Sequence, residues 1–95
     1  MGGEVRDVRG FRIKGRVQGV FFRAWTQDMA KGLELRGVVR NLSDGSVEAW
    51  AEGPVGQLEV FEKQLWIGPP ASLVEAVERT SPGGPLPDKG FIILR

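Results

Sequence analysis

The sequence predicts a single α+β domain in which a mainly antiparallel sheet carries two helices on one face. Three observations predict it. A chain of 95 residues is too short to enclose two separate cores. Segments of alternating apolar residues, typical of half-buried strands, are interrupted twice by segments with helical spacing. Turns that contain Gly or Pro separate these segments, and a composition of 41% apolar and 26% charged residues is that of a globular protein.

The first half of the chain predicts a strand, a loop and a helix. In Val8–Lys14, Phe11 and Ile13 point to one side and basic residues to the other, which is the pattern of a half-buried strand. Residues 15–21 follow as a loop with a glycine at positions 15 and 19. From Phe22 the apolar residues recur every three or four positions, so we expect an amphipathic helix that ends near Gly32.

The second half predicts four further elements and one long loop. Two strands around Val38 and Val47 are joined by a turn that contains Asp44-Gly45, a strong hairpin signal. A second helix opens at Gly53-Pro54 and stops at residues 68–70. The remaining segments are a strand over 71–79, a Pro- and Gly-rich loop over 81–90 and a short strand over 91–95. The order βαββαβ with an extra C-terminal strand predicts a ferredoxin-like sandwich spanning residues 5–95, a fold that hosts many unrelated functions.

Composition excludes several kinds of chemistry. The chain contains no cysteine and no histidine, so it has no thiolate nucleophile, no disulfide and no imidazole base or metal ligand. The longest apolar runs are too short to cross a membrane, and residues 1–12 lack the apolar core of a signal peptide. We therefore expect a cytoplasmic protein with no membrane partner, no metal and no cofactor.

Charge is divided unevenly along the chain. Residues 1–40 carry nine Lys and Arg against four Asp and Glu, a net +5, whereas residues 41–95 carry four against eight, a net −4. One interpretation is an anionic ligand at the N-terminal half. The alternative is a set of solvated faces with no ligand, and charge alone does not choose between them.

The start of the first helix predicts an anion site. The opening N–H groups of a helix normally receive a side-chain cap, but residues 19–22 are Gly, Val, Phe and Phe. A bound oxyanion would satisfy these donors, and Arg23 follows at once to pair with two of its oxygens. The alternative is a helix that begins later with Thr26 as its cap. The loop matches neither nucleotide-binding glycine motif, so we expect no nucleotide.

Two segments resemble the signatures of the acylphosphatase family. Residues 13–23, Ile-Lys-Gly-Arg-Val-Gln-Gly-Val-Phe-Phe-Arg, are similar to the first, with its G-x-V-Q-G-V-x-F-R core intact. Residues 37–41, Gly-Val-Val-Arg-Asn, followed by Gly45-Ser46-Val47 and Gly53, resemble the second, although the family usually has an aromatic residue where Val38 stands. The resemblance extends over nearly the whole chain, to the closing Phe91-x-Ile93.

This resemblance implies an enzyme that hydrolyses acyl phosphates to a carboxylate and inorganic phosphate. It implies that Arg23 holds the phosphate, that Asn41 positions the attacking water, and that one loop cradles the phosphate, namely Gly15, Arg16, Val17, Gln18, Gly19, Val20 and Phe21. Read from the residues alone, Asn41 is an ordinary turn residue. Arg16 adds positive field to the loop or is simply solvated, and nothing in the sequence demands more than a monomer.

Two other interpretations belong to different functional classes. RNA-recognition domains share the βαββαβ order and stack bases on strand aromatics, but the strand over 46–52 offers one aromatic residue, Trp50, and two acids. We therefore expect no nucleic acid partner. A regulatory domain that binds a small anion without turnover is the second alternative. Trp25 is expected in the core, and Trp50 either on the outer face of the sheet or near the mouth of the site.

Overall fold

A computed structural model describes residues 4–95, and they form five strands and two helices. The elements in chain order are β1 (Arg6–Arg16), α1 (Phe22–Gly32), β2 (Arg36–Asn41), β3 (Val47–Pro54), α2 (Val55–Ile67), β4 (Leu73–Thr80) and β5 (Phe91–Ile93). The predicted order of elements is confirmed. The strand β1 runs to Arg16, so it includes Gly15 and Arg16, which the sequence pattern placed in the following loop.

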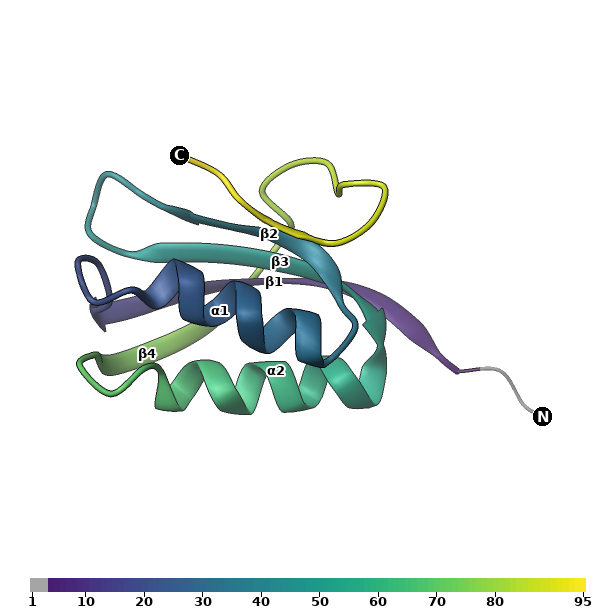
Figure 1. The fold of residues 1–95 in the computed structure, drawn as a ribbon, viewed down its shortest axis with the longest axis horizontal. Coiled ribbons are helices and arrows are strands. Elements are labelled where there is room, and N and C mark those ends of the chain that lie inside the picture. The colour runs from purple at the N-terminus through teal and green to yellow at the C-terminus, as the bar shows by residue number, and fades with distance from the viewer. Residues whose placement is uncertain (1–3) are drawn as a thin grey trace.

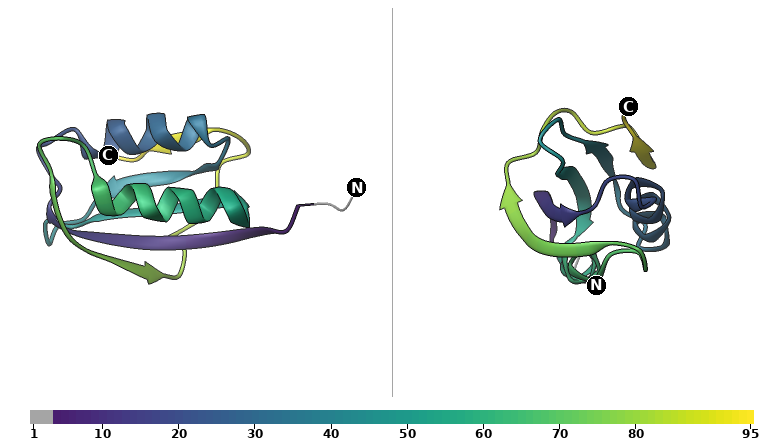
Figure 2. Two further views of the ribbon diagram at one scale, coloured as in Figure 1. Left: turned by 90° about the horizontal axis from the view of Figure 1, so that it is seen from below. Right: turned by 90° about the vertical axis from the view of Figure 1, so that its left-hand side faces the viewer.

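The five strands lie in one sheet in the order β4-β1-β3-β2-β5. The pairs β1–β3, β1–β4 and β2–β3 are antiparallel, whereas β5 pairs with β2 in parallel. Both helices cover the same face of the sheet (Figures 1 and 2). The ferredoxin-like α+β sandwich predicted from the sequence is therefore confirmed, with a mainly antiparallel sheet.

The core lies between the helices and the sheet. Phe61 of α2 packs between Phe11 of β1 and Phe91 of β5, with ring centroids 5.7 and 5.9 Å apart. All three rings are buried, and each contributes about 1.5–3 kcal/mol relative to an exposed side chain. Since Phe91 is the first residue of β5, this aromatic row fixes the terminal strand beside β2. It thereby brings the end of the chain to the start of α1.

The opposite face of the sheet is covered by the loop over residues 81–90. Trp50 of β3 lies under this loop with 2% of its surface exposed, and its indole N–H donates to the carbonyl of Pro85 at 3.2 Å. The Arg40 guanidinium lies 5.3 Å from the centre of the Trp50 ring. Of the two positions predicted for Trp50, the structure shows the outer face of the sheet. Trp25 packs edge-on against Phe22 on the core side, as expected.

Neither helix within residues 4–95 has the length and apolar character that a membrane span requires.

Candidate active site

Helix α1 begins without a side-chain cap. Phe21 occupies the N-cap position in the left-handed conformation, at φ 62° and ψ 26°, and no side chain bonds to the first turn. Within residues 4–95, the backbone N–H groups from Gly19 to Ala24 donate to no protein acceptor; the first paired amide is that of Trp25, 3.0 Å from the carbonyl of Phe21. The prediction of an uncapped helix start is confirmed. Thr26, the alternative cap, lies fully buried inside the helix.

The loop before α1 curls because two of its residues have positive φ. Gly19 has φ 75° and Phe21 has φ 62°, on either side of Val20. A backbone that alternates in this way turns successive N–H groups toward a common point and forms a concave site for an anion. The positive end of the α1 dipole adds to the same field.

A pocket of about 340 Å³ opens at this helix start. Its lining includes the loop before α1 and the last residues of the chain, two segments that lie at the same end of the molecule (Figures 1 and 2). Its lining comes from three segments far apart in the sequence, namely the loop and first turn of α1, the end of β2, and β5 with the residues after it. The lining residues are Val17, Gly19, Phe21, Phe22, Arg23, Ala24, Asn41, Ile93 and Arg95.

The structure therefore brings Arg23 and Asn41 together at one pocket, with three residues of the predicted loop. The other four predicted residues do not line it. Gly15 and Arg16 pair with β4 through a bulge, and a Cβ on Gly15 would lie 2.1 Å from the carbonyl of Leu73. Gly15 is thus needed for the path of the chain into the loop. Val20 packs against the core, and the side chain of Gln18 bonds to the loop after β2.

Arg23 supplies a cation that is available to a ligand. Its guanidinium makes one long contact, 3.4 Å from the carbonyl of Leu94, and no Asp or Glu within residues 4–95 forms an ion pair with it. The planar guanidinium can donate to two oxygens of one phosphate. Because α1 starts one residue earlier, Arg23 projects from the same turn that carries the unpaired amides.

Asn41 is the last residue of β2 and is exposed at the pocket. The tight loop that follows it is closed by the amide of Leu42, which donates to the carbonyl of Ser46 at 2.9 Å. Asp44 accepts bonds from the hydroxyl and amide of Ser46, and these bonds hold the pKa of its carboxyl below the usual value. The loop therefore presents Asn41 on a constrained backbone.

Arg95 is a second cation at the pocket, and sequence reasoning did not find it. Its place depends on the parallel pairing of β5 with β2, which sets Ile93 opposite Val39 and leads the chain past Asn41. No local sequence pattern predicts that Arg95 and Asn41 line the same pocket, because they lie more than fifty positions apart. The only available signal was the basic residue at the end of the last predicted strand, over 91–95.

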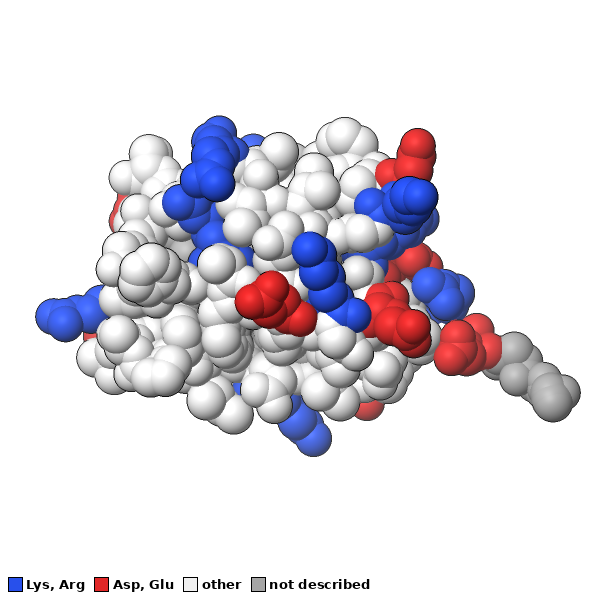
Figure 3. Space-filling model, viewed as in Figure 1, with Lys and Arg blue, Asp and Glu red and all other residues white. Residues whose placement is uncertain are grey.

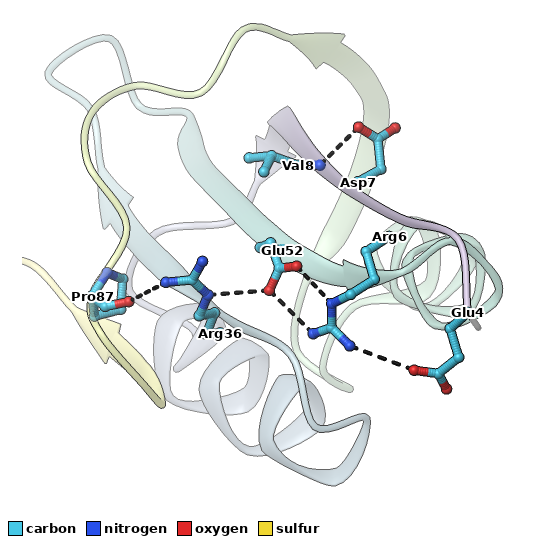
Figure 4. Close-up of polar contacts among 7 residues, drawn as sticks. All are labelled: Glu4, Arg6, Asp7, Val8, Arg36, Glu52 and Pro87. Atoms are coloured by element: carbon cyan, nitrogen blue, oxygen red, sulfur yellow. Dashed lines mark hydrogen bonds and ion pairs between the residues drawn. The ribbon is translucent and has the colours of Figure 1, made fainter.

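The uneven charge along the chain is mostly neutralised by ion pairs. Glu52 of β3 accepts bonds from Arg6 of β1 at 2.8 Å and from Arg36 of β2 at 3.1 Å (Figure 4). Glu48 likewise pairs with Arg40 at 2.8 Å. In Figure 3, basic side chains stand together near the C-terminus, whereas both signs mix at the opposite end. Arg23 and Arg95, the two basic residues that line the pocket, form no ion pair within residues 4–95.

The pocket lining contains no carboxylate, hydroxyl or thiol side chain. Among residues 4–95 no three acidic side chains gather into a group that could ligate a metal ion. The chemistry that this arrangement can support is therefore binding of an oxyanion by N–H donors and two guanidinium groups. Asn41 offers both a carbonyl acceptor and an amide donor beside that oxyanion.

Comparisons with known proteins point to one family. The family model described as acylphosphatase matches residues 9–93. An acylphosphatase of Xanthomonas campestris pv. campestris (strain 8004) is 54% identical over 70 residues, which cover 74% of this chain and 80% of that protein. An acylphosphatase of Alkalilimnicola ehrlichii is 43% identical over 90 residues, 95% of this chain and 100% of that protein.

A solved structure gives the same result for the fold. The crystal structure of acylphosphatase from Bacillus subtilis has a TM-score of 0.85 and 34% identity to this chain, and the match covers 96% of this chain and 100% of that one. The family model spans both predicted signatures, from before Gly15 to beyond Gly53. The resemblance inferred from two short motifs thus holds over most of the sequence and over the fold, and the chain belongs to the acylphosphatase family of enzymes.

Proposed function

We propose that this chain hydrolyses acyl phosphates by direct attack of water on phosphorus. The oxygen of water forms the new P–O bond while the bond from phosphorus to the acyl oxygen breaks. The electron pair of that bond leaves with the carboxylate, and the proton lost by the water passes to phosphate or solvent. No covalent intermediate with the protein forms.

The observation that carries this proposal is the lining of the pocket. Unpaired amides from Gly19 onward and the guanidinium of Arg23 face the same space. These groups bind the three non-bridging oxygens of a phosphoryl group. No side chain of the lining can act as a nucleophile, which favours water in that role.

The leaving group explains why so few catalytic groups suffice. The carboxylic acid conjugate to the leaving carboxylate has a pKa of roughly 4, so the group departs without a proton from the protein. A general acid is therefore unnecessary, in keeping with the absence of histidine and cysteine from the sequence. Phosphoryl transfer relies mainly on positioning and on stabilisation of charge.

Arg23 and the loop amides take the stabilising part in this proposal. Charge on the phosphoryl oxygens is met by fixed donors that need no rearrangement during the reaction. In many phosphotransferases Mg²⁺ stabilises this charge. Here Arg23 and the loop amides would stabilise it, so the proposed reaction needs no metal. Asn41 takes the orienting part: its side-chain carbonyl accepts a hydrogen bond from water and aims the water in line with the leaving oxygen.

The structure disfavours base stacking on the sheet. Trp50, the one aromatic residue of β3, is 98% buried under the loop over 81–90, since only 2% of its surface is exposed. An RNA-recognition domain requires such an aromatic to face solvent. We propose that the chain acts without nucleic acid; a filter-binding titration at low salt would reveal tight, salt-sensitive binding if it does not.

The test of the proposed function is hydrolysis of a simple acyl phosphate in EDTA by the unaltered chain, Arg23→Ala and Asn41→Ala. Both variants should lose nearly all turnover, by about 10²–10³-fold or more, because each removes a group that acts on the transition state. Arg23→Ala should also weaken inhibition by inorganic phosphate, whereas Asn41→Ala should retain it. Normal turnover in Asn41→Ala would refute the water-positioning role.

The same assay separates an enzyme from a domain that only binds anions. Binding of inorganic phosphate with no turnover by the unaltered chain would support the regulatory alternative. Turnover that disappears in EDTA and returns with a divalent cation would refute a metal-independent mechanism.

A further inference from the structure

Gln18 links the phosphate loop to the segment that carries Asn41. Its side-chain nitrogen, Nε2, donates to the carbonyl of Leu42 at 2.8 Å and to the carbonyl of Ser46 at 2.8 Å. These carbonyls belong to the two ends of the tight loop after β2. Both N–H bonds of one amide group are thus used to hold one loop.

We infer that Gln18 is a positioning residue, which sets the place of Asn41 relative to the bound phosphate. This inference rests on the proposed role of Asn41 in orienting water. Asn41 precedes Leu42 directly, so a bond to the carbonyl of Leu42 restrains the chain one residue beyond Asn41. Gln18 itself lies in the loop between β1 and α1, one residue before Gly19, where the unpaired amides begin.

Within residues 4–95, no other hydrogen bond directly joins the two halves of the site. The pocket joins the loop before α1 to the end of β2, yet β1 and β2 are not neighbours in the sheet, because β3 lies between them. Among the hydrogen bonds recorded for residues 4–95, those of Gln18 are the ones that tie residues 17–21 to residues 41–46. Apart from these bonds, the two segments are joined within the described part of the chain only through β3, where Val47 pairs with Ile13 of β1 and with Asn41 of β2.

The chemistry of an amide side chain suits this role. The carbonyls of Leu42 and Ser46 each accept one backbone bond within the loop, and the side chain of Gln18 supplies a second donor to each from one nitrogen. The site is partly buried, and loss of the Gln18 donors leaves each carbonyl with its backbone bond alone and removes the tie between the loop and residue 18. The loop then moves as a unit, and Asn41 moves with it.

Two substitutions of Gln18 test the inference. Gln18→Met keeps the length of the side chain and removes both donors, and Gln18→Glu keeps the shape and replaces donors by acceptors. In both, kcat should fall by about 10–100-fold, because a displacement of about 1 Å at the reacting centre costs about 10²-fold. In Gln18→Met, which adds no charge, the inhibition constant of inorganic phosphate should stay within about twofold, since the phosphate donors are unchanged.

Gln27 provides a matched control. Its Nε2 donates to the carbonyl of Phe91 at 2.8 Å, so it ties helix α1 to strand β5 through one amide, but it makes no hydrogen bond to the loop after Asn41. Gln27→Met should keep kcat within about twofold. If Gln27→Met and Gln18→Met lose kcat equally, the effect reflects general loosening and the inference is wrong.

A double substitution makes the test independent of overall stability. In an Asn41→Ala background, Gln18→Met should cost little further turnover, because its effect passes through Asn41. Additive losses would overturn the inference, and so would full activity of both single variants of Gln18. If Asn41→Ala itself is fully active, the proposed water-positioning role of Asn41 fails instead, and the two failures are thereby distinguished.

Discussion

At the residue scale, Phe21 adopts a backbone conformation that is rare for its type. A left-handed φ costs a residue with a Cβ about 1–2 kcal/mol, and Phe21 gains little from burial because 85% of its surface is exposed. Strain of this kind persists where the surroundings impose it, often at ligand sites. Here it turns the amides around residue 21 toward the pocket, which is the geometry that the proposed phosphate site requires.

Arg95 gives a prediction at the same scale. The Arg95 guanidinium adds positive potential to the pocket. Arg95 is exposed, and no buried ion pair within residues 4–95 fixes the position of its side chain. Arg95→Ala should raise the KM for an acyl phosphate by about twofold to fivefold, in line with about 0.5–1 kcal/mol for an exposed charge, and leave kcat nearly unchanged. The difference should shrink in high salt, where exposed charges are screened.

A large fall in kcat for Arg95→Ala would contradict this prediction. It would assign Arg95 a part in the transition state that the pocket geometry alone does not require.

At the scale of the element, helix α1 ends in a motif that usually contains glycine. The amide of Leu35 donates to the carbonyl of Ala30 at 3.0 Å, and that of Glu34 donates to Lys31 at 3.0 Å, which is a Schellman ending. The residue in the left-handed conformation is Glu34, with φ 58°, whereas Gly32 is still helical. The sequence pattern placed the end near Gly32 correctly, but the glycine does not occupy the strained position.

Glu34→Gly should therefore stabilise the chain. Relief of the left-handed strain is worth about 1–2 kcal/mol, and the added freedom of glycine in the unfolded chain removes about 0.5–1 of it. A net gain of about 1 kcal/mol raises the Tm of a domain of this size by about 4–8 °C. Thermal unfolding measures it, and Glu34→Ala, which keeps a Cβ, should show no such rise. An unchanged Tm in Glu34→Gly would show that the strain is absent.

The elements could be predicted from sequence because each has a local signal. Alternating apolar residues at Phe11 and Ile13 predicted β1. The lack of a capping side chain at residues 19–22 predicted that α1 starts uncapped. What could not be predicted depends on contacts between distant segments. Gly15 lies in a bulge made with β4, and Arg95 reaches the pocket through pairing of β5 with β2.

The motif resemblance and the fold contributed different parts of the candidate site. The motifs named Arg23 and Asn41, and the fold places both at one pocket. The motifs gave no part to the side chain of Gln18, because its two acceptors are backbone carbonyls whose position no sequence pattern encodes.

At the scale of the whole molecule, Glu52 connects three parts of the fold. It binds Arg6 of β1 and Arg36 of β2, and Arg36 donates in turn to the carbonyl of Pro87 in the loop that covers Trp50 (Figure 4). Hydrogen bonds from Arg6 hold the pKa of Glu52 below its usual value. Burial opposes this effect, and the bond from Arg36 adds to it. The carboxylate form is thus favoured by folding.

The sign of the pH dependence follows from that lowered pKa. Stability from Glu52 is fully present above the pKa of an unfolded glutamate, about 4.3, and is lost as the pH falls through the lower folded value. Glu52→Gln should reduce the free energy of unfolding by about 1 kcal/mol at pH 7, the upper end for surface pairs. Urea unfolding at pH 7 and pH 3 measures this free energy for both chains, and the difference between Glu52→Gln and the unaltered chain should be smaller at pH 3. An equal difference at both values would contradict the role of the charge.

The most direct measurement is an NMR titration of the ¹⁵N-labelled chain with inorganic phosphate. Amide resonances from Gly19 to Ala24 should shift, because their N–H groups gain acceptors, and the guanidinium signal of Arg23 should shift with them. Residues at the opposite end, such as Glu34, should not respond. Saturable shifts at those amides are the expected result. Amides from Gly19 to Ala24 that stay unmoved while phosphate binds elsewhere, or does not bind at all, would contradict it.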